Sequence, residues 1–146
     1  MKIGIGNDHT AIELKKELVA YLEAQGHTLI DYGTNALESF NYAFAGERVS
    51  IGVVQHEVDC GIALCGTGIG ISIACNKING IRACVCSEPY SAKLSKQHNN
   101  TNILCFGARV VGTELAKMIV DEWLGATYEG GRHEERVATI MSFEKK

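Results

Sequence analysis

A short glycine-rich stretch of the chain carries a potential nucleophile or base. It reads Cys65-Gly66-Thr67-Gly68-Ile69-Gly70 and comes at the end of an apolar run. Glycines at alternate positions let successive backbone N–H groups point into one concavity, which suits a phosphate or a developing oxyanion. A helix that begins near Gly70 would add the positive end of its dipole, and this favours the thiolate of Cys65. The competing interpretation is that Cys65 is a small buried residue beside a tight turn.

Several familiar loop functions do not fit this stretch. A Walker A loop needs Lys and then Ser or Thr after the last glycine, but Ile71 and Ser72 follow Gly70. A tyrosine phosphatase loop needs Arg at the position of Ile71. The dinucleotide-binding fingerprint also fails, since the third glycine position after Gly4 and Gly6 is occupied by His9. Because the chain has no Cys-x-x-Cys, a thiol redox enzyme is a poor fit as well.

Polar side chains follow the other apolar runs. Asp8 and His9 come directly after the first run, Tyr42 lies beyond the second and Arg109 follows the last. Asp8 could simply cap a helix, and His9 could be an ordinary surface histidine. Each of these residues therefore has a structural and a functional interpretation.

Two pairs of residues with regular spacing also allow both a structural and a functional interpretation. Arg132 and Arg136 are four residues apart on a helical stretch, so they share a face. That face is either an exposed ion-pair surface or a two-arginine phosphate clamp. The pair Cys84-x-Cys86 points to one face of a strand and fits a core better than a metal site. Since the candidate residues lack the closely spaced ligand pairs of metal sites, we expect no metal.

Apolar runs and amphipathic stretches alternate along the chain. Five runs have the length of strands, namely Lys2–Gly6, Thr28–Tyr32, Gly61–Cys65, Arg82–Cys86 and Ile103–Gly107. Helices are expected between Asp8 and Gln25 and near Ala43–Gln55, Gly70–Lys77, Tyr90–Gln97, Gly112–Trp123 and His133–Phe143. This alternation predicts an α/β fold, a single doubly wound, Rossmann-like domain over residues 1–146 with a five-stranded parallel sheet and a C-terminal helix. Ligands of such folds bind outside the carboxyl ends of the strands.

The bulk properties exclude some classes of protein. The 146 residues carry a formal net charge of −3, with 46% hydrophobic and 21% charged residues. Proteins that bind nucleic acid or a membrane surface need a basic face, so neither partner is expected. No apolar run is long enough for a membrane helix, and the first residues lack the apolar core of a signal peptide. The six cysteines do not have the spacing of a disulfide scaffold, which favours a cytoplasmic location.

Longer blocks of sequence make a family recognisable. They are Gly6-Asn-Asp-His9, the stretch from Cys65 to Lys77, Gly80-Ile-Arg-Ala83, Cys86-Ser-Glu-Pro-Tyr-Ser-Ala92, His98-Asn-Asn-Thr-Asn102 and Tyr128-Glu-Gly-Gly-Arg-His133. These blocks closely resemble ribose-5-phosphate isomerase type B, and the likeness covers essentially the whole chain. The resemblance implies a cofactor-free aldose–ketose isomerase of the pentose phosphate pathway. It would interconvert ribose 5-phosphate and ribulose 5-phosphate through a cis-enediolate.

The resemblance also implies roles for single residues. Cys65 would be the general base that moves a proton between C1 and C2, and His98 would open the furanose ring, with Thr67 and Asp8 completing the catalytic set. The binding residues would hold the enediolate oxygen (Gly66, Thr67, Gly68, Gly70), the sugar hydroxyls (Asp8, Tyr42, Asn99) and the phosphate (His9, Arg109, Arg132, Arg136).

The chain departs from the family pattern at two places. The family's Asp-Tyr-Pro is Asn41-Tyr42-Ala43 here, which puts the placement of Tyr42 in question. A second branch of the family has a carboxylate at the position of Ile71. Because Ile71 cannot take a proton, the base in this chain must be Cys65.

Alternatives for the function stay open. The nearest is a six-carbon substrate, as in allose- or galactose-6-phosphate isomerases, although the His98-Asn99 pair suits furanose ring opening and favours the pentose. A more distant one is a sugar-phosphate-binding module without catalytic activity. His98 precedes the fifth strand and so lies near the amino edge of the sheet, opposite Cys65. We therefore expect a homodimer, or a tetramer, in which His98 reaches the Cys65 pocket of a neighbouring chain.

Overall fold

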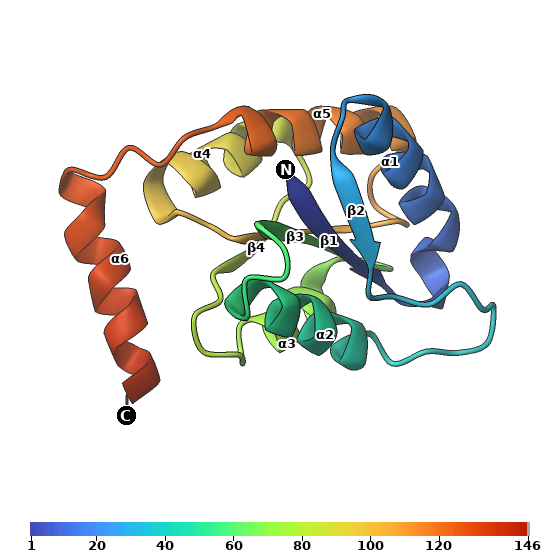
Figure 1. The fold of residues 1–146 in the computed structure, drawn as a ribbon, viewed down its shortest axis with the longest axis horizontal. Helices are drawn as coiled ribbons and strands as arrows, with labels where there is room; N and C mark the ends of the chain where they lie inside the picture. The colour runs from blue at the N-terminus through green and yellow to red at the C-terminus, as the bar shows by residue number, and fades with distance from the viewer. Residues whose placement is uncertain (146) are drawn as a thin grey trace.

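The computed structural model describes residues 1–145 and has a five-stranded parallel sheet at its centre (Figure 1). The strands are β1 (Lys2–Asn7), β2 (Thr28–Asp31), β3 (Cys60–Cys65), β4 (Ala83–Val85) and β5 (Ile103–Gly107), in the order β2-β1-β3-β5-β4. The helices are α1 (Ile12–Ala24), α2 (Tyr42–Val54), α3 (Ile69–Cys75), α4 (Pro89–Asn99), α5 (Thr113–Gly125) and α6 (Arg132–Ser142). Short 3-10 turns cover His9–Ala11 and Phe143–Lys145.

Helices cover both faces of the sheet. Helices α1, α4 and α5 lie on one face, and α2 and α3 on the other (Figure 1). Each face has its own hydrophobic core, one around Trp123 and Phe106 and the other around Val49 and Ile71. Strand β3 is buried along its whole length, as expected for a central parallel strand. The predicted doubly wound α/β fold is confirmed.

The register of the central strands brings three loops together. Asn7 of β1 lies opposite Leu64, and Cys65 of β3 lies opposite Gly107 of β5. The strand order reverses between β1 and β3, since the chain adds β2 on one side of β1 and the remaining strands on the other. Ligands of doubly wound sheets bind at such a switch point. The loops after β1, β3 and β5 meet there.

Some predicted boundaries need correction. Strand β4 is shorter than the predicted Arg82–Cys86, because it is an edge strand whose start is held by a side chain: the Arg82 N–H donates to Asn102 Oδ1 at 2.8 Å. Helix α4 is longer than predicted, so His98 and Asn99 form its last turn instead of following it. Asn100 then ends the helix in the left-handed conformation (φ 47°), a common helix-terminating geometry.

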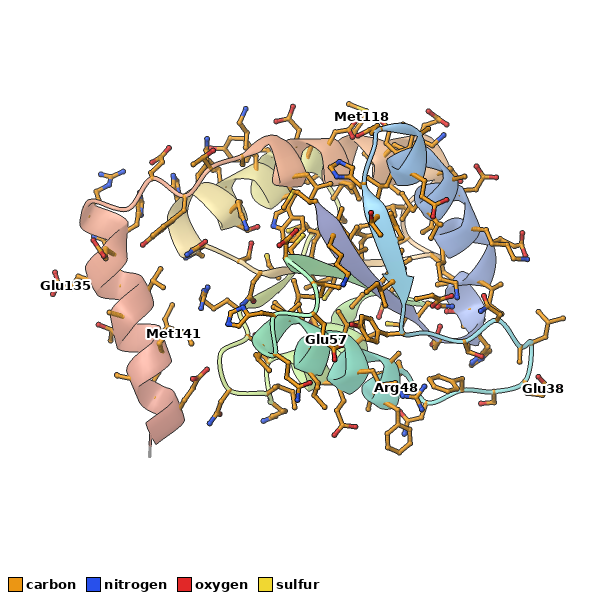
Figure 2. The ribbon with its side chains drawn as sticks, viewed as in Figure 1. Glu38, Arg48, Glu57, Met118, Glu135 and Met141 are labelled. Atoms are coloured by element: carbon orange, nitrogen blue, oxygen red, sulfur yellow. The ribbon has the colours of Figure 1, made fainter. Side chains whose placement is uncertain are left out.

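Helix α6 stands apart from the rest of the fold (Figure 1). The segment before it is tied to the body by a hydrogen bond from Glu129 N–H to Gln97 O (3.0 Å), and the helix itself accepts one from Arg82 Nη1 at Met141 Sδ (3.3 Å). Figure 2 shows Met141 on the side of α6 that faces the body and Glu135 on the opposite side. None of the helices in the described residues is both long and apolar enough to cross a membrane.

Candidate functional site

The sulfur of Cys65 lies at the carboxyl end of the central strand β3. The residue is only 3% exposed, and its Sγ accepts a hydrogen bond from the backbone N–H of Gly68 at 3.1 Å. An N–H donor at this distance stabilises negative charge on the sulfur. Cys65 therefore lies at the rim of the glycine loop, where the sequence places it, and its thiolate has a main-chain partner.

The glycine loop is held tightly against the end of β5. Gly68 has φ +80°, and a Cβ atom there would lie 2.6 Å from backbone carbons of Phe106. A Cβ on Gly107 would similarly lie 2.5 Å from Gly66 O and from Thr67 Cα. Because neither position can carry a side chain without moving backbone, these two glycines set the path of the loop.

Only some of the loop amides are free to bind a ligand. The Gly68 N–H is taken by Cys65, and the Ile69 N–H donates to Thr67 Oγ1 at 3.3 Å. Within residues 1–145, the N–H groups of Gly66 and Thr67 donate to no protein acceptor. The amides of Gly68 and Ile69 therefore hold the loop and the thiol in place, whereas those of Gly66 and Thr67 remain available for an anion.

Asp8 is buried beside this loop. Its N–H donates to Leu64 O at 3.2 Å, and its Oδ1 accepts from Thr10 N–H (2.9 Å) and Thr10 Oγ1 (2.6 Å). The capping interpretation of Asp8 is thus confirmed, since the carboxylate caps the 3-10 turn. Thr10 was missed by sequence reasoning, although a Thr two residues after an Asp is a common partner in such turns. It also borders the loop, 3.7 Å from where a Cβ on Gly66 would be.

His9 is held in one orientation by the loop after β2. The backbone N–H of Phe40 donates to His9 Nδ1 at 3.0 Å. In the neutral imidazole this places the ring proton on Nε2, which becomes a hydrogen-bond donor. Phe40 was not identified from the sequence, because the interaction uses its main chain and its side-chain type carries no signal.

Tyr42 and Arg109 complete the group at this edge. The Tyr42 ring covers Gly70, where a Cβ would lie 2.6 Å from ring carbons. The Arg109 N–H donates to Gly66 O at 3.0 Å, and its side chain passes the same glycine. Asn41 caps α2 by accepting a hydrogen bond from Ala43 N–H at 2.9 Å. The replacement of the family's Asp-Tyr-Pro therefore still leaves Tyr42 at the start of α2 and against the loop.

The structure thus brings together most of the predicted site residues at the carboxyl edge of the sheet: Asp8, His9, Tyr42, Cys65, Gly66, Thr67, Gly68, Gly70 and Arg109. It does not bring the other four, His98, Asn99, Arg132 and Arg136, to this edge. His98 and Asn99 end α4 just before β5 begins, and the two arginines are exposed on α6. Strand β3 alone separates the two edges by about 16 Å. The expectation that His98 lies at the amino edge of the sheet, opposite Cys65, is confirmed.

His98 has two neighbours of its own at that amino edge. Its ring stacks on His133, with centroids 4.2 Å apart and planes at 10°. The carboxylate of Glu129 lies 3.9 Å from His98 Nε2 and 3.7 Å from His133 Nε2. Burial, together with the neighbouring His98, lowers the pKa of His133, although the carboxylate of Glu129 acts in the opposite direction. Sequence reasoning missed this group, although Glu129 and His133 have the i, i+4 spacing of interacting residues.

The same three residues offer atoms that a metal could bind, all within 4.8 Å of one another. The two imidazole rings are parallel, however, and the lone pair of a ring nitrogen lies in the plane of its ring. Lone pairs in parallel planes do not converge on one ion, as the tetrahedral geometry of zinc requires. The stacked arrangement therefore suits hydrogen bonding to a polar ligand better than metal binding.

Comparison with known proteins extends over the whole chain. A family described as "Ribose/Galactose Isomerase" matches residues 3–140. Ribose-5-phosphate isomerase B of Escherichia coli is 58% identical over 145 residues, which cover 99% of this chain and 97% of that protein. The structure of the Clostridium thermocellum ribose-5-phosphate isomerase B has a TM-score of 0.98 at 51% identity, covering 99% of this chain and 98% of the other.

A second similar structure is described with a bound ligand. The Mycoplasma genitalium ribose-5-phosphate isomerase B, described with bound ribulose-5-phosphate, has a TM-score of 0.95 at 35% identity. The alignment covers 99% of this chain and 97% of that one. These matches agree with the resemblance found in the sequence blocks. The chain belongs to the ribose/galactose isomerase family.

Proposed function

We propose that this chain is an aldose–ketose isomerase that interconverts ribose 5-phosphate and ribulose 5-phosphate without a cofactor. The observation that carries the proposal is the position of Cys65 Sγ, at the end of β3 with the Gly68 N–H 3.1 Å away and the Gly66 and Thr67 amides beside it. A relative with 58% identity carries the same activity in its name, and one similar structure is described with ribulose-5-phosphate.

The arrangement meets the chemical demand of the reaction. A C–H bond next to a carbonyl is a weak acid, so the enzyme needs a positioned base and a stabilised oxyanion. In the proposed mechanism the Cys65 thiolate removes the proton from C2 of the open-chain aldose, and the enediolate oxygen is held by the free loop amides. The same thiol then returns the proton to C1. Ile71 is fully buried and carries no acid, so it cannot replace Cys65 as the base.

The other residues at this edge are assigned to substrate binding. His9 Nε2–H and the Arg109 guanidinium face the phosphate, for which both are suitable donors. Tyr42 covers the loop from the α2 side and holds a sugar hydroxyl. Asp8 positions Thr10, and its carboxylate can accept one more hydrogen bond, from another hydroxyl of the sugar.

We further propose that the site is completed by a second copy of the chain. His98, Asn99, Arg132 and Arg136 lie at the opposite edge and reach a Cys65 pocket only from a neighbouring subunit. Exposed apolar side chains support this assembly. Helix α6 exposes Ile140, while Phe44 of α2 and Ile69 and Ile73 of α3 are each more than half exposed. In a symmetric dimer the apolar side of each protruding α6 covers such a surface on the other copy.

The proposal also includes a reducing, cytoplasmic location. All six cysteines are free thiols, and five of them are buried. A catalytic thiolate needs a compartment that keeps thiols reduced.

The decisive experiment compares substrates on the purified protein. Ketose formation is followed from ribose 5-phosphate, allose 6-phosphate and galactose 6-phosphate, with the Cys65→Ala variant alongside. We expect turnover of the pentose phosphate, and a loss of about 10²–10⁴-fold in kcat for Cys65→Ala. The matched control is Cys84→Ser, a half-buried cysteine outside the site, which keeps its activity. Ligand binding without turnover in the unmodified protein would instead establish a binding module.

A further inference from the structure

Two cysteine side chains outside the site are in contact with each other. Cys84 lies in the middle of β4, and Cys86 follows the end of that strand, so both project from one face. Their sulfur atoms are 3.2 Å apart, and both are free thiols. At this distance one thiol donates its S–H to the other. The proposed isomerase chemistry uses neither residue.

The backbone spacing allows a covalent bond between them. Cα atoms of residues two apart on a strand are separated by about 6.6 Å, and disulfides occur at Cα separations up to about 6.8 Å. The strand geometry extends through Cys86, because its N–H donates to Cys105 O of β5 at 2.9 Å. The Cβ atoms on one face of an extended strand have a similar separation, whereas a disulfide brings them to about 3.5–4.5 Å. The disulfide therefore requires a local bend of the chain at the end of β4, and it stores strain. It would lie at the long end of the allowed range, where such bonds are readily reduced.

The two thiols have different environments. Cys84 is half-buried and lines a cavity of about 260 Å³ together with Arg82 and Asn99. Cys86 is only 2% exposed. The hydrogen bond from Cys86 lowers the pKa of Cys84 to about 7, so much of Cys84 is thiolate at neutral pH. The thiolate is the form that reacts with peroxides, and the cavity gives a small oxidant access to it.

We propose that Cys84 and Cys86 form a peroxide-sensitive dithiol, which hydrogen peroxide or an alkyl hydroperoxide converts into a disulfide that thiol reductants reverse. In the first step the Cys84 thiolate attacks one peroxide oxygen. The S–O bond forms, the O–O bond breaks, and the departing hydroxide or alkoxide takes up a proton. In the second step Cys86 Sγ attacks Cys84 Sγ, so that the S–S bond forms and the S–O bond breaks.

The products balance these two steps. The hydroxide that leaves Cys84 takes the proton of Cys86 and becomes water. Overall the two thiols lose two electrons and two protons, and hydrogen peroxide is reduced to water. The inference does not depend on the isomerase activity, because neither cysteine is among the proposed site residues and the test below measures the thiols and not turnover.

Another pair of cysteines provides an internal comparison. Cys75 and Cys105 are also hydrogen-bonded to each other, but both are fully buried in the core on the α2/α3 face of the sheet. Neither has the exposed surface that a peroxide needs. If contact between sulfurs were sufficient, both pairs would react, whereas the geometry points to Cys84 and Cys86 alone.

The test uses the intact, unmodified protein. The reduced protein is treated with equimolar hydrogen peroxide, quenched, unfolded, alkylated and digested with trypsin. Cleavage after Arg82 and Lys93 releases the peptide Ala83–Lys93, which contains Cys84 and Cys86 and no other cysteine. We expect this peptide to lose the mass of two hydrogen atoms and to carry no alkyl group. Dithiothreitol should restore its double alkylation, and the peptide with Cys105 should stay alkylated throughout.

Three outcomes would overturn the proposal. The first is recovery of Ala83–Lys93 with both thiols alkylated after peroxide treatment. The second is over-oxidation of Cys84 with Cys86 still alkylated. The third is a disulfide that joins this peptide to another one. In a supporting experiment, Cys86→Ser lacks the resolving thiol, so Cys84 should accumulate as a sulfenic acid that dimedone labels.

Discussion

The backbone N–H of Gly68 donates a hydrogen bond to the sulfur of Cys65 across 3.1 Å. This contact exists because Gly68 adopts φ +80° and packs against the backbone of Phe106. The proposed base is thus stabilised by main chain, and the position of that main chain depends on a residue without a side chain. The consequences can be measured at Gly68 itself.

The variant Gly68→Ala should lose activity and stability together. The added Cβ would lie 2.6 Å from backbone carbons, so the loop must move and the N–H leaves the sulfur. We expect kcat to fall by about 10²–10³-fold, as for the loss of an oxyanion-hole donor. The strained backbone should lower the free energy of unfolding by about 1–3 kcal/mol. Steady-state kinetics and urea unfolding measure the two effects.

The control for this variant is Gly112→Ala. Gly112 has φ −76° and open space around its Cβ position, and it lies before α5, away from the thiol. The Gly112→Ala variant should therefore have the same kcat as the unmodified protein. Equal kcat values for Gly68→Ala and the unmodified protein would show that the loop amide has no part in the chemistry.

A mixture of two inactive variants should regain activity if the site is formed between subunits. Cys65→Ala and His98→Ala remove groups at opposite edges of the sheet. In a mixed dimer, one of the two sites carries both changes and the other carries neither. Random exchange of subunits should therefore restore about a quarter of the unmodified activity. The measurement is ketose formation after co-refolding, and the absence of any recovery would place His98 in the Cys65 pocket of its own chain or outside catalysis.

Two substitutions of His9 should differ in their effect on substrate affinity. Phe40 N–H donates to Nδ1, so the phosphate donor is Nε2–H. A glutamine amide nitrogen can occupy the position of Nε2, whereas an asparagine amide is too short. We expect His9→Asn to raise KM by about tenfold to 100-fold, as for loss of a hydrogen bond to a charged group. His9→Gln should raise KM less, and the same KM for both variants would contradict this donor assignment.

The ion pair between Lys15 and Asp31 should make stability depend on pH. Burial raises the pKa of Asp31, but hydrogen bonds from Lys15 Nζ at 2.8 Å and from Gly33 and Asn35 outweigh this and hold it below its ordinary value of 3.8. A lowered carboxylate pKa stabilises the fold above pH 3.8, and that stability disappears as pH falls through the lower folded value.

The variant Asp31→Asn tests this pH dependence. It should cost about 1–2 kcal/mol at pH 7, since the carboxylate is partly solvated. The cost should shrink as the pH falls below 3.8. Urea unfolding at neutral and acidic pH measures it, and Lys16→Met, which breaks the exposed pair with Glu13, should have little effect at either pH. A cost of Asp31→Asn that is the same at both pH values would contradict the linkage.

Much of the candidate site could be predicted from one residue pattern. The run from Cys65 to Gly70 defines both the thiol and the loop, since three glycines within six residues after an apolar strand have few structural solutions. Asp8, His9 and Arg109 could be placed because they follow strands of a parallel sheet, and the carboxyl ends of such strands share an edge. Thr10 and Phe40 could not be found this way. Thr10 contributes through a local turn, and Phe40 contributes only an N–H group that every residue except proline has.

The sequence by itself determined the fold class and the order of strands and helices along the chain, and it singled out Cys65 as the candidate base, because apolar periodicity and glycine spacing are local properties of the chain. Only the tertiary structure decided which groups meet. Loops that are far apart in the sequence converge at the β1/β3 edge, and His98 stacks on His133 at the other edge. The contact between Cys84 and Cys86 is a further example. Their spacing puts both on one face of a strand, but only the side-chain positions show that the sulfur atoms touch. Distances between side chains depend on packing across the whole molecule, and this packing cannot be derived from any local stretch of residues.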